Sequence, residues 1–341
     1  MRRLSDDRGS VVVIIVVFVV VLFGIGAVVV DVASQYHKRR TLQNGADAAA
    51  LAVAQMCAAG DCGDPLTTAQ QYADANSSDG SATVDELCGS GVTGASACSD
   101  PPALSGASYV RVTTSHYVSY TFGRLIGVDG NTTKARATVA WGGPSRLTSE
   151  LPVTISQCEF DSYTNDNTDL KDPPPYETGY PTPEAVIYFH TNSQATPCPA
   201  GPAGSDLPGG FGWLQPDPDT CKATSDIYGW WDDKTGRAVP SDCTVAEVAS
   251  LVGTVIHIPL FNETNDLNGT NGQYTMDGFA AFYLTGYSIE GQYKEASLVT
   301  GQPPCKGDTS CLSGFFVKDD SPVSGEIGGP AMGVTIIQLV S

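Results

Sequence analysis

Basic side chains are scarce in this chain of 341 residues, which has 18 Lys and Arg against 37 Asp and Glu and a net charge of -19. Six of the basic and three of the acidic residues lie within residues 1–40, so the rest carries 12 basic and 34 acidic residues, a net charge of -22. Such a domain repels nucleic acid and anionic head groups, and no nucleic-acid partner is expected. Charged residues make up only 16 %, while there are 37 Gly and 22 Pro. This balance is more typical of an extracellular β-rich domain than of a cytosolic enzyme.

The sequence also lacks the common signatures of catalysis. It contains no G-x-S-x-G nucleophile motif and no glycine-rich phosphate loop between a strand and a helix. The acidic pairs Asp232-Asp233 and Asp319-Asp320 are interpreted as solvated loop acids. His190 and His257 lie within apolar segments, where a structural role is favoured over that of a catalytic base. We therefore expect no enzymatic activity, no catalytic residue and no cofactor.

Metal ligands at diagnostic spacing are missing as well. No C-x2-C pair occurs, and the histidines are not clustered at ligand spacing, which argues against zinc; they are His37, His116, His190 and His257. The best candidate for calcium is the oxygen-rich segment Asn262–Gly272. It does not match the EF-hand spacing, so an Asn/Gly turn between two strands is the favoured interpretation and no metal site is predicted.

What the chain has instead is one long apolar run from Val11 to Val30, without a single charge. Twenty helical residues rise about 30 Å, the thickness of a bilayer core. We interpret the run as a retained transmembrane anchor, marked along its length by Val11, Val20, Gly24 and Val30. The alternative is a cleaved signal peptide, which would give a secreted product, but such apolar cores usually span about 7–15 residues and end at a small-x-small site.

Two basic clusters flank the run, and they do not decide its orientation. Arg2, Arg3 and Arg8 precede it, and Lys38, Arg39 and Arg40 follow it, so the positive-inside rule gives no preference. Ten cysteines break the tie, because all lie C-terminal to the run and their number is even. This predicts disulfides in an oxidising compartment, with the short tail in the cytoplasm and the bulk of the chain outside.

Disulfides are favoured over zinc, but the full pairing is not readable from the sequence. Sequence-local pairs are Cys88–Cys98, Cys305–Cys311 and Cys57–Cys62. The ten candidates are Cys57, Cys62, Cys88, Cys98, Cys158, Cys198, Cys221, Cys243, Cys305 and Cys311.

Three regions are expected: residues 1–56 with the anchor and a helix, a small extracytoplasmic α+β unit over 57–145, and a disulfide-rich mainly-β domain over 146–341. Leu42, Ala46, Ala49, Val53 and Met56 fall on one helical face. A second helix is expected over 67–76, a stapled loop over 77–106, and strands over 109–114 and 134–141, with a linker over 142–144.

The third region contains many short apolar segments separated by Gly, Pro and Asn. Strands are expected over 151–155, 185–190, 253–259, 278–286, 314–318 and 331–340, with an irregular loop over 161–183 and a helix only over 245–252. The fold class is therefore α+β, ending in a disulfide-stapled β sandwich or barrel.

The N-terminus resembles a known family. The motif order is Arg8-Gly9-Ser10, the apolar run, Val30-Asp31-Val32, and then the segment from Arg39 to Ala52, RTLQNGADAAALA after its first Arg. This order resembles the TadE/TadG-like (Flp pilus assembly) N-terminal region over roughly residues 8–55. The later half, with the turn Gly209–Leu214 and Gly286-Tyr287, is similar to exported domains that accompany this N-terminus.

The resemblance implies a part in building or anchoring thin adhesive pili, with the lipid bilayer and other pilus-assembly or cell-surface proteins as partners. Two departures narrow it. Counting from Ser10, Ile14 stands where pilin-like members carry Glu, so polymerisation as a pilin is not expected. The D-x-S-x-S metal motif of a von Willebrand A domain is absent, so metal-dependent adhesion is not carried over.

The leading hypothesis is a non-enzymatic, single-pass membrane protein of a Tad/Flp-type pilus-assembly or tight-adherence system. The alternative is a surface-anchored carbohydrate-binding or hydrolytic domain in the later half. It would need exposed aromatic side chains, such as Trp213, Trp230 and Trp231, beside a suitably spaced acidic pair.

Overall fold

The protein is described by a computed structural model that covers residues 8–77, 82–104, 106–189, 198, 211–232, 238–265, 272–307, 309–320 and 324–340. The chain divides into two compact units. Unit 1 comprises residues 1–102, 109–140 and 338–341, and unit 2 comprises residues 103–108 and 141–337.

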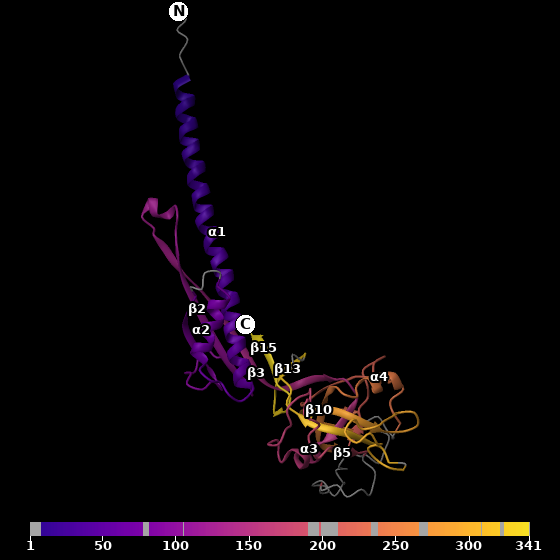
Figure 1. Ribbon diagram of the computed structural model, residues 1–341. Coiled ribbons are helices and arrows are strands. Elements are labelled where there is room, and N and C mark those ends of the chain that lie inside the picture. Colours follow the sequence, from indigo (N-terminus) through magenta and orange to yellow (C-terminus); the bar gives the residue numbers. More distant parts are fainter. Residues whose placement is uncertain are drawn as a thin grey trace, which may run out of the picture. The chain divides into compact units, whose positions relative to one another are not determined.

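Unit 1 is built on one long helix, α1 (Arg8–Ala58), which runs without a break from the apolar segment into the folded part of the unit (Figure 1). The helical face expected beyond the apolar run is confirmed: Leu42, Ala46, Ala49 and Val53 are at most 2 % exposed. The N-terminal half of α1 projects beyond the strands of the same unit. The two halves of one helix therefore have different surroundings.

The second helix, α2 (Pro65–Ala75), lies against α1 at close range. Its N-terminus is capped by Asp64, whose carboxylate accepts from the backbone N–H of Thr67 at 3.2 Å, and Pro65 occupies the first helical position. A Cβ on Gly45 of α1 would lie 3.2 Å from the carbonyl oxygen of Ala73. The glycine, a weak helix former, is thus explained by the close approach of two helices.

The other side of unit 1 is an antiparallel sheet with the order β1-β2-β3. Its elements are β1 (Thr83–Ser90), β2 (Ser108–Ser119), the short 3₁₀ helix η1 (Gly123–Ile126) and β3 (Gly130–Ser149). The hairpin of β2 and β3 is long, and its tip, which holds η1, lies beside α1 (Figure 1). Residues 130–140 of β3 belong to unit 1 and residues 141–149 to unit 2.

Unit 2 is mainly β. Its largest sheet has the strand order β5-β12-β10-β9-β4-β6, with β8, β11 and β14 also paired to β10. The bounds are β4 (Val153–Ser156), β5 (Ala185–Tyr188), β6 (Phe211–Trp213), β7 (Ala223–Asp226), β8 (Trp230–Asp232), β9 (Val255–Asn265), β10 (Gln273–Ser288), β11 (Lys294–Glu295), β12 (Cys311–Val317), β13 (Gly325–Gly329), β14 (Ala331–Met332) and β15 (Ile336–Val340). Strands β7, β13 and β15 pair with β3, and the two helices of the unit are α3 (Gln157–Thr164) and α4 (Val245–Ser250).

The core of unit 2 lies on both faces of the central strands. Every residue of β12 is buried, and β10 is buried throughout its second half. One core cluster contains Phe282 and Phe316, whose rings meet edge to face with centroids 5.0 Å apart, while Phe279 and Phe315 belong to a second cluster. These strands are therefore nearly continuous apolar runs instead of alternating ones, as expected for strands covered on both sides.

Five disulfides are present, and each of them lies within one of the two units. Cys57–Cys62 and Cys88–Cys98 belong to unit 1, and Cys158–Cys198, Cys221–Cys243 and Cys305–Cys311 belong to unit 2. The sequence favoured disulfides over zinc binding by the cysteines, and the structure has disulfides. The three predicted sequence-local pairs, Cys57–Cys62, Cys88–Cys98 and Cys305–Cys311, are among them. An N-terminal apolar helix followed by a disulfide-stapled, mostly β region is the fold class expected from the sequence.

Several local expectations were wrong. The segment 142–144 is not a linker, because β3 runs through it and pairs with β13. Gly143 is needed there because a Cβ would lie 2.0 Å from the carbonyl oxygen of Pro330. Part of the expected loop 77–106 is strand β1. This strand lies at the edge of the sheet and is largely exposed, so its sequence lacks the usual alternation of apolar and polar residues. Helix α3 was not expected; it precedes the expected loop 161–183 and overlaps its first four residues. Strand β6 was not expected either and lies in the supposed aromatic turn.

Candidate functional site

The feature that bears most directly on function is the first half of α1. The large apolar side chains from Val11 to Val30 are 40–76 % exposed, and the helix contains a stretch long and apolar enough to cross a membrane. Val11, Val20 and Val30 are among these exposed side chains, and a Cβ on Gly24 would meet nothing within 4 Å. In water so much exposed apolar surface is unfavourable, whereas in hydrocarbon it is not.

The basic residues after the apolar run belong to the same helix. Arg39 and Arg40 are exposed, Lys38 is half-buried, and the guanidinium of Arg40 lies 5.8 Å from the ring centre of Tyr36. Arg8 is the first residue of α1, while Arg2 and Arg3 lie outside the described residues. The three residues from Lys38 to Arg40 begin seven residues beyond Asp31, about 10 Å along the helix axis.

Asp31, the first residue after the apolar run, joins α1 to the tip of the β2–β3 hairpin. Its carboxylate accepts hydrogen bonds from three consecutive backbone N–H groups: Thr121 at 2.8 Å, Phe122 at 3.1 Å and Gly123 at 2.8 Å. These amides stand at the N-terminus of η1, where unpaired N–H groups favour an anion. Asp31 is 8 % exposed, so a charged side chain is buried here but fully partnered.

Further contacts continue from Asp31 along α1. One turn further on, the amide of Gln35 donates to the hydroxyl of Tyr120. Further along α1, the hydroxyl of Thr114 donates to the carbonyl oxygen of Leu42 at 3.0 Å. The side-chain amide of Gln43 donates to the carbonyl oxygen of Arg136, also at 3.0 Å. Polar contacts thus hold the hairpin to α1 from the middle of its strands to its tip.

Between the tip and α1 lies an apolar groove of about 350 Å³. Its wall on the helix side begins at Gly24 and ends at Gln35, and Phe122 and Val128 contribute from the tip. A second depression of about 640 Å³ on the same helix is lined by Phe122 from the tip. Its helix residues are Val19, Leu22, Phe23, Gly24, Gly26, Ala27 and Val30. The tip therefore lies beside residues of the apolar run and not only beside Asp31.

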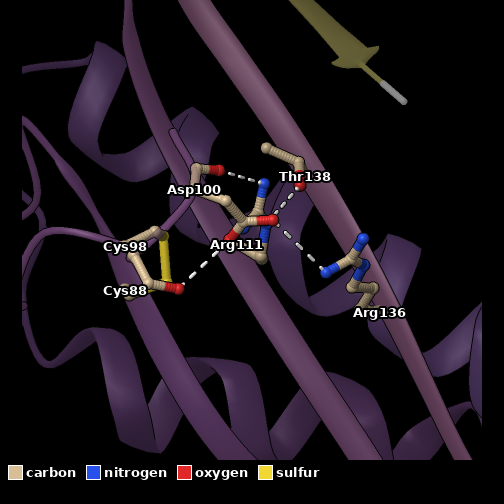
Figure 2. Close-up of polar contacts among 7 residues, drawn as sticks. Cys88, Cys98, Asp100, Arg111, Arg136 and Thr138 are labelled. Carbon is tan, nitrogen blue, oxygen red and sulfur yellow. Dashed lines mark hydrogen bonds and ion pairs between the residues drawn. A yellow bond between two sulfur atoms is a disulfide. The ribbon is translucent and has the colours of Figure 1, made fainter. Parts of the chain in front are cut away.

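A polar cluster stiffens the far part of the sheet (Figure 2). The guanidinium of Arg111 donates to Thr138 Oγ1 at 3.0 Å, to the Asp100 carbonyl oxygen at 2.9 Å and to the Asp100 carboxylate. This hydrogen bond holds the pKa of Asp100 below its ordinary value, and Arg136 adds an ion pair at 3.7 Å. The Cys88–Cys98 disulfide fixes the chain two residues before Asp100. These contacts explain the cluster as a structural clamp.

Unit 2 contains one buried group of charges, centred on His257. Nδ1 lies 3.0 Å from a carboxylate oxygen of Glu150, and Nε2 lies 2.8 Å from one of Asp319. Burial opposes protonation, but the hydrogen bonds and charges of Asp319 and Glu150 outweigh it and raise the pKa of His257 to about 9. Both ring nitrogens face carboxylates, which fits the expected structural role. Asp319 is 7 % exposed and is not the solvated loop acid that was expected.

The aromatic side chains named for a carbohydrate surface do not share one exposed face. Trp213 is fully buried, and the indole N–H of Trp231 donates to the carbonyl oxygen of Asp226 at 2.9 Å in a half-buried position. Trp230 alone of the three is exposed, at 45 %. Among the described residues no group of His, Cys, Asp and Glu side chains is arranged to hold a metal ion, and residues 266–271 of the calcium candidate lie outside them, as does His190.

The Asp31 junction gives a direct prediction. In Asp31→Ala the three backbone amides lose a charged acceptor, which costs about 2 kcal/mol locally and raises their exchange rate about 30-fold. Hydrogen exchange of the full-length protein in detergent measures this at Thr121, Phe122 and Gly123. Asp31→Asn keeps one acceptor oxygen, so the exchange rate of these amides is expected to lie between those of the native protein and of Asp31→Ala. Unchanged protection in Asp31→Ala would contradict the assignment of Asp31 as the anchor of the tip.

The His257 cluster predicts a pH dependence of stability. Because the folded-state pKa of about 9 lies above the ordinary 6.5, the contribution of His257 is complete below pH 6.5 and is lost as the pH rises through about 9. A shift of this size corresponds to roughly 3 kcal/mol. All four tryptophans lie in unit 2, so unfolding followed by tryptophan fluorescence between pH 6.5 and 10 reports on it. His257→Gln should be less stable at neutral pH and should lack this component; an equally steep loss in both proteins would refute it.

Comparison with known proteins bears on the same part of the chain. Residues 9–56 match the family model described as Putative Flp pilus-assembly TadE/G-like, and the matched segment coincides with nearly all of α1. Comparisons with curated proteins and with solved structures find no match. The N-terminal region of this chain, residues 9–56, is therefore similar to the TadE/G-like Flp pilus-assembly family.

Proposed function

We propose that this protein is a non-enzymatic, single-pass membrane component of a Tad/Flp-type pilus-assembly or tight-adherence system. The observation that carries the proposal is the coincidence of the family match with an apolar, uncovered helix. A helix is one of the few structures that satisfy all their backbone hydrogen bonds within lipid. The folded units would then be held at the membrane surface, in reach of other pilus-assembly or cell-surface proteins.

The orientation we propose has the N-terminus in the cytoplasm and both folded units outside. It is supported by the five disulfides, which persist in oxidising compartments and are rare in the cytosol. All of them follow the apolar run in the sequence. The net charge of -22 beyond residue 40 keeps these units soluble and away from anionic lipid, apart from local apolar contacts.

The absence of a polymerising role is also part of the proposal. Ile14 stands in the apolar run at the position where pilin-like relatives carry Glu, and its side chain is 66 % exposed. An apolar residue there has no charge with which to pair the N-terminus of a neighbouring subunit. We therefore assign the helix as a permanent anchor and the protein as an accessory of the pilus, not its repeating subunit.

The orientation can be tested with single introduced cysteines, because the native cysteines are paired in disulfides and would not react with a maleimide. A membrane-impermeant maleimide added to intact cells should label Tyr228→Cys, whose native side chain is 73 % exposed in unit 2, without any reductant. Ser5→Cys should be labelled only after lysis. Labelling of Ser5→Cys in intact cells, with Tyr228→Cys protected until lysis, would reverse the proposed topology.

The role in the pilus system can be tested by deletion. Cells lacking this chain should lose thin pili or surface attachment, measured by electron microscopy and by retention on a surface. A variant without residues 11–30 should not restore either, because its folded units are no longer held at the membrane. The matched control, Ile14→Leu, should restore both. Unchanged pili and attachment in the deletion strain would refute the proposed role in the pilus system.

A further inference from the structure

The tip of the β2–β3 hairpin, residues 120–129, has a feature that the anchor alone does not explain. Phe122 is 40 % exposed and Val128 is 46 % exposed, so both keep apolar surface uncovered although the tip is fixed to α1. Phe122 lines the two depressions beside the apolar run, together with helix residues from Val19 to Val30. The tip therefore lies alongside the segment that must sit in lipid if α1 spans a membrane.

The depth of this contact follows from helix geometry. Asp31 marks the end of the apolar run, and Gly24 lies seven residues before it, about 10 Å along the helix axis. The hydrocarbon core extends about 15 Å from its edge to the midplane. A side chain beside Gly24 is thus inside the outer half of the core whenever the run from Val11 to Val30 fills the bilayer.

Backbone N–H groups of the tip are hydrogen-bonded within the protein, as an environment without water requires. The N–H groups of Thr121, Phe122 and Gly123 are bound by the Asp31 carboxylate. The remaining turn closes on itself: Tyr120 N–H donates to Asp129, Gly127 N–H to Arg124 and Val128 N–H to Gly123, at 2.9, 3.2 and 3.0 Å. Unpaired backbone groups are what excludes loops from lipid, and here six amides are paired.

The charges around the tip fit an interfacial position. The carboxylate of Asp31 is stabilised by three backbone N–H donors at the level where the apolar run ends, and Asp129 is exposed at the base of the tip. Arg124 is exposed on η1, and a side chain of this length reaches head-group phosphates from below the surface. Gly24 and Gly26 leave open space on the helix beside the tip, where a Cβ would meet nothing within 4 Å.

We propose that the hairpin tip is a second membrane contact, in which Phe122 and Val128 enter the outer leaflet and lipid acyl chains fill the apolar groove between the tip and Gly24–Val28. The inference rests on the proposed membrane anchoring. Lipid is the occupant because the groove is continuous with the lipid-facing surface of the apolar run. The tip thereby fixes the distance between the membrane and unit 1.

Photocrosslinking in the full-length protein, reconstituted in vesicles of phosphatidylglycerol and phosphatidylethanolamine, tests this proposal. p-Benzoylphenylalanine replaces Phe122, and mass spectrometry identifies the adducts. The expected products are lipid adducts, in a yield of the same order as from the same label at Val20 within the span. The label at Tyr72, an aromatic residue of α2 that is 45 % exposed, is the matched control and should give none.

Other outcomes separate the two proposals. Lipid adducts at Val20 without any at Phe122 would overturn the membrane contact and leave the anchor intact. Adducts at Phe122 with a second copy of the chain in place of lipid would overturn it as well. No lipid adduct at either position would refute the anchor itself. Asp31→Ala, which frees the tip, should lower the lipid adducts at Phe122 and leave those at Val20 unchanged.

Discussion

One uninterrupted helix, α1, joins a fully exposed apolar half to a packed half, and the rest of unit 1 depends on that constraint. From Val11 to Val30, α1 presents only apolar side chains and glycines, and a helix bonds its backbone groups internally, as a hydrocarbon environment requires. From Leu42 onward the same helix packs against α2 and is hydrogen-bonded to β2 and β3, and small alanines permit close approach. Asp31 stands at the change of surroundings. It is a buried charge whose partners are three backbone amides, so it needs no basic side chain as a partner.

The sequence predicted the parts of the fold that depend on local pattern. The apolar run, the helical face of Leu42, Ala46, Ala49 and Val53, and the strands with clear alternation depend on periodicity alone, which a single segment contains. The disulfides followed from the number and one-sided placement of the cysteines. The family resemblance at the N-terminus, carried by the order of motifs around the run, agrees with the match over residues 9–56.

The features that the sequence did not predict depend on contacts between distant segments. The Gly-Gly-Pro at 142–144 resembles a linker, but its glycines permit the backbone of residue 330 to approach within contact distance. Asp319 resembles a loop acid until His257, 62 residues away, is placed beside it. The junction of Asp31 with residues 121–123 spans about ninety residues, and no local signal in either segment names the other. Only the position of Asp31 directly after the apolar run distinguishes it.

The unbroken path of α1 from Val11 to Ala58 has a mechanical consequence. A protein domain joined to its membrane segment by a flexible linker can reorient independently of that segment. Here the hydrogen-bonded helix continues into the core of unit 1, and the hairpin tip braces it at the level of Asp31. If α1 spans a membrane as we propose, any tilt or rotation of its N-terminal half must turn the packed part of unit 1 with it. A change in bilayer thickness would then be transmitted along the helix to the folded part of the unit.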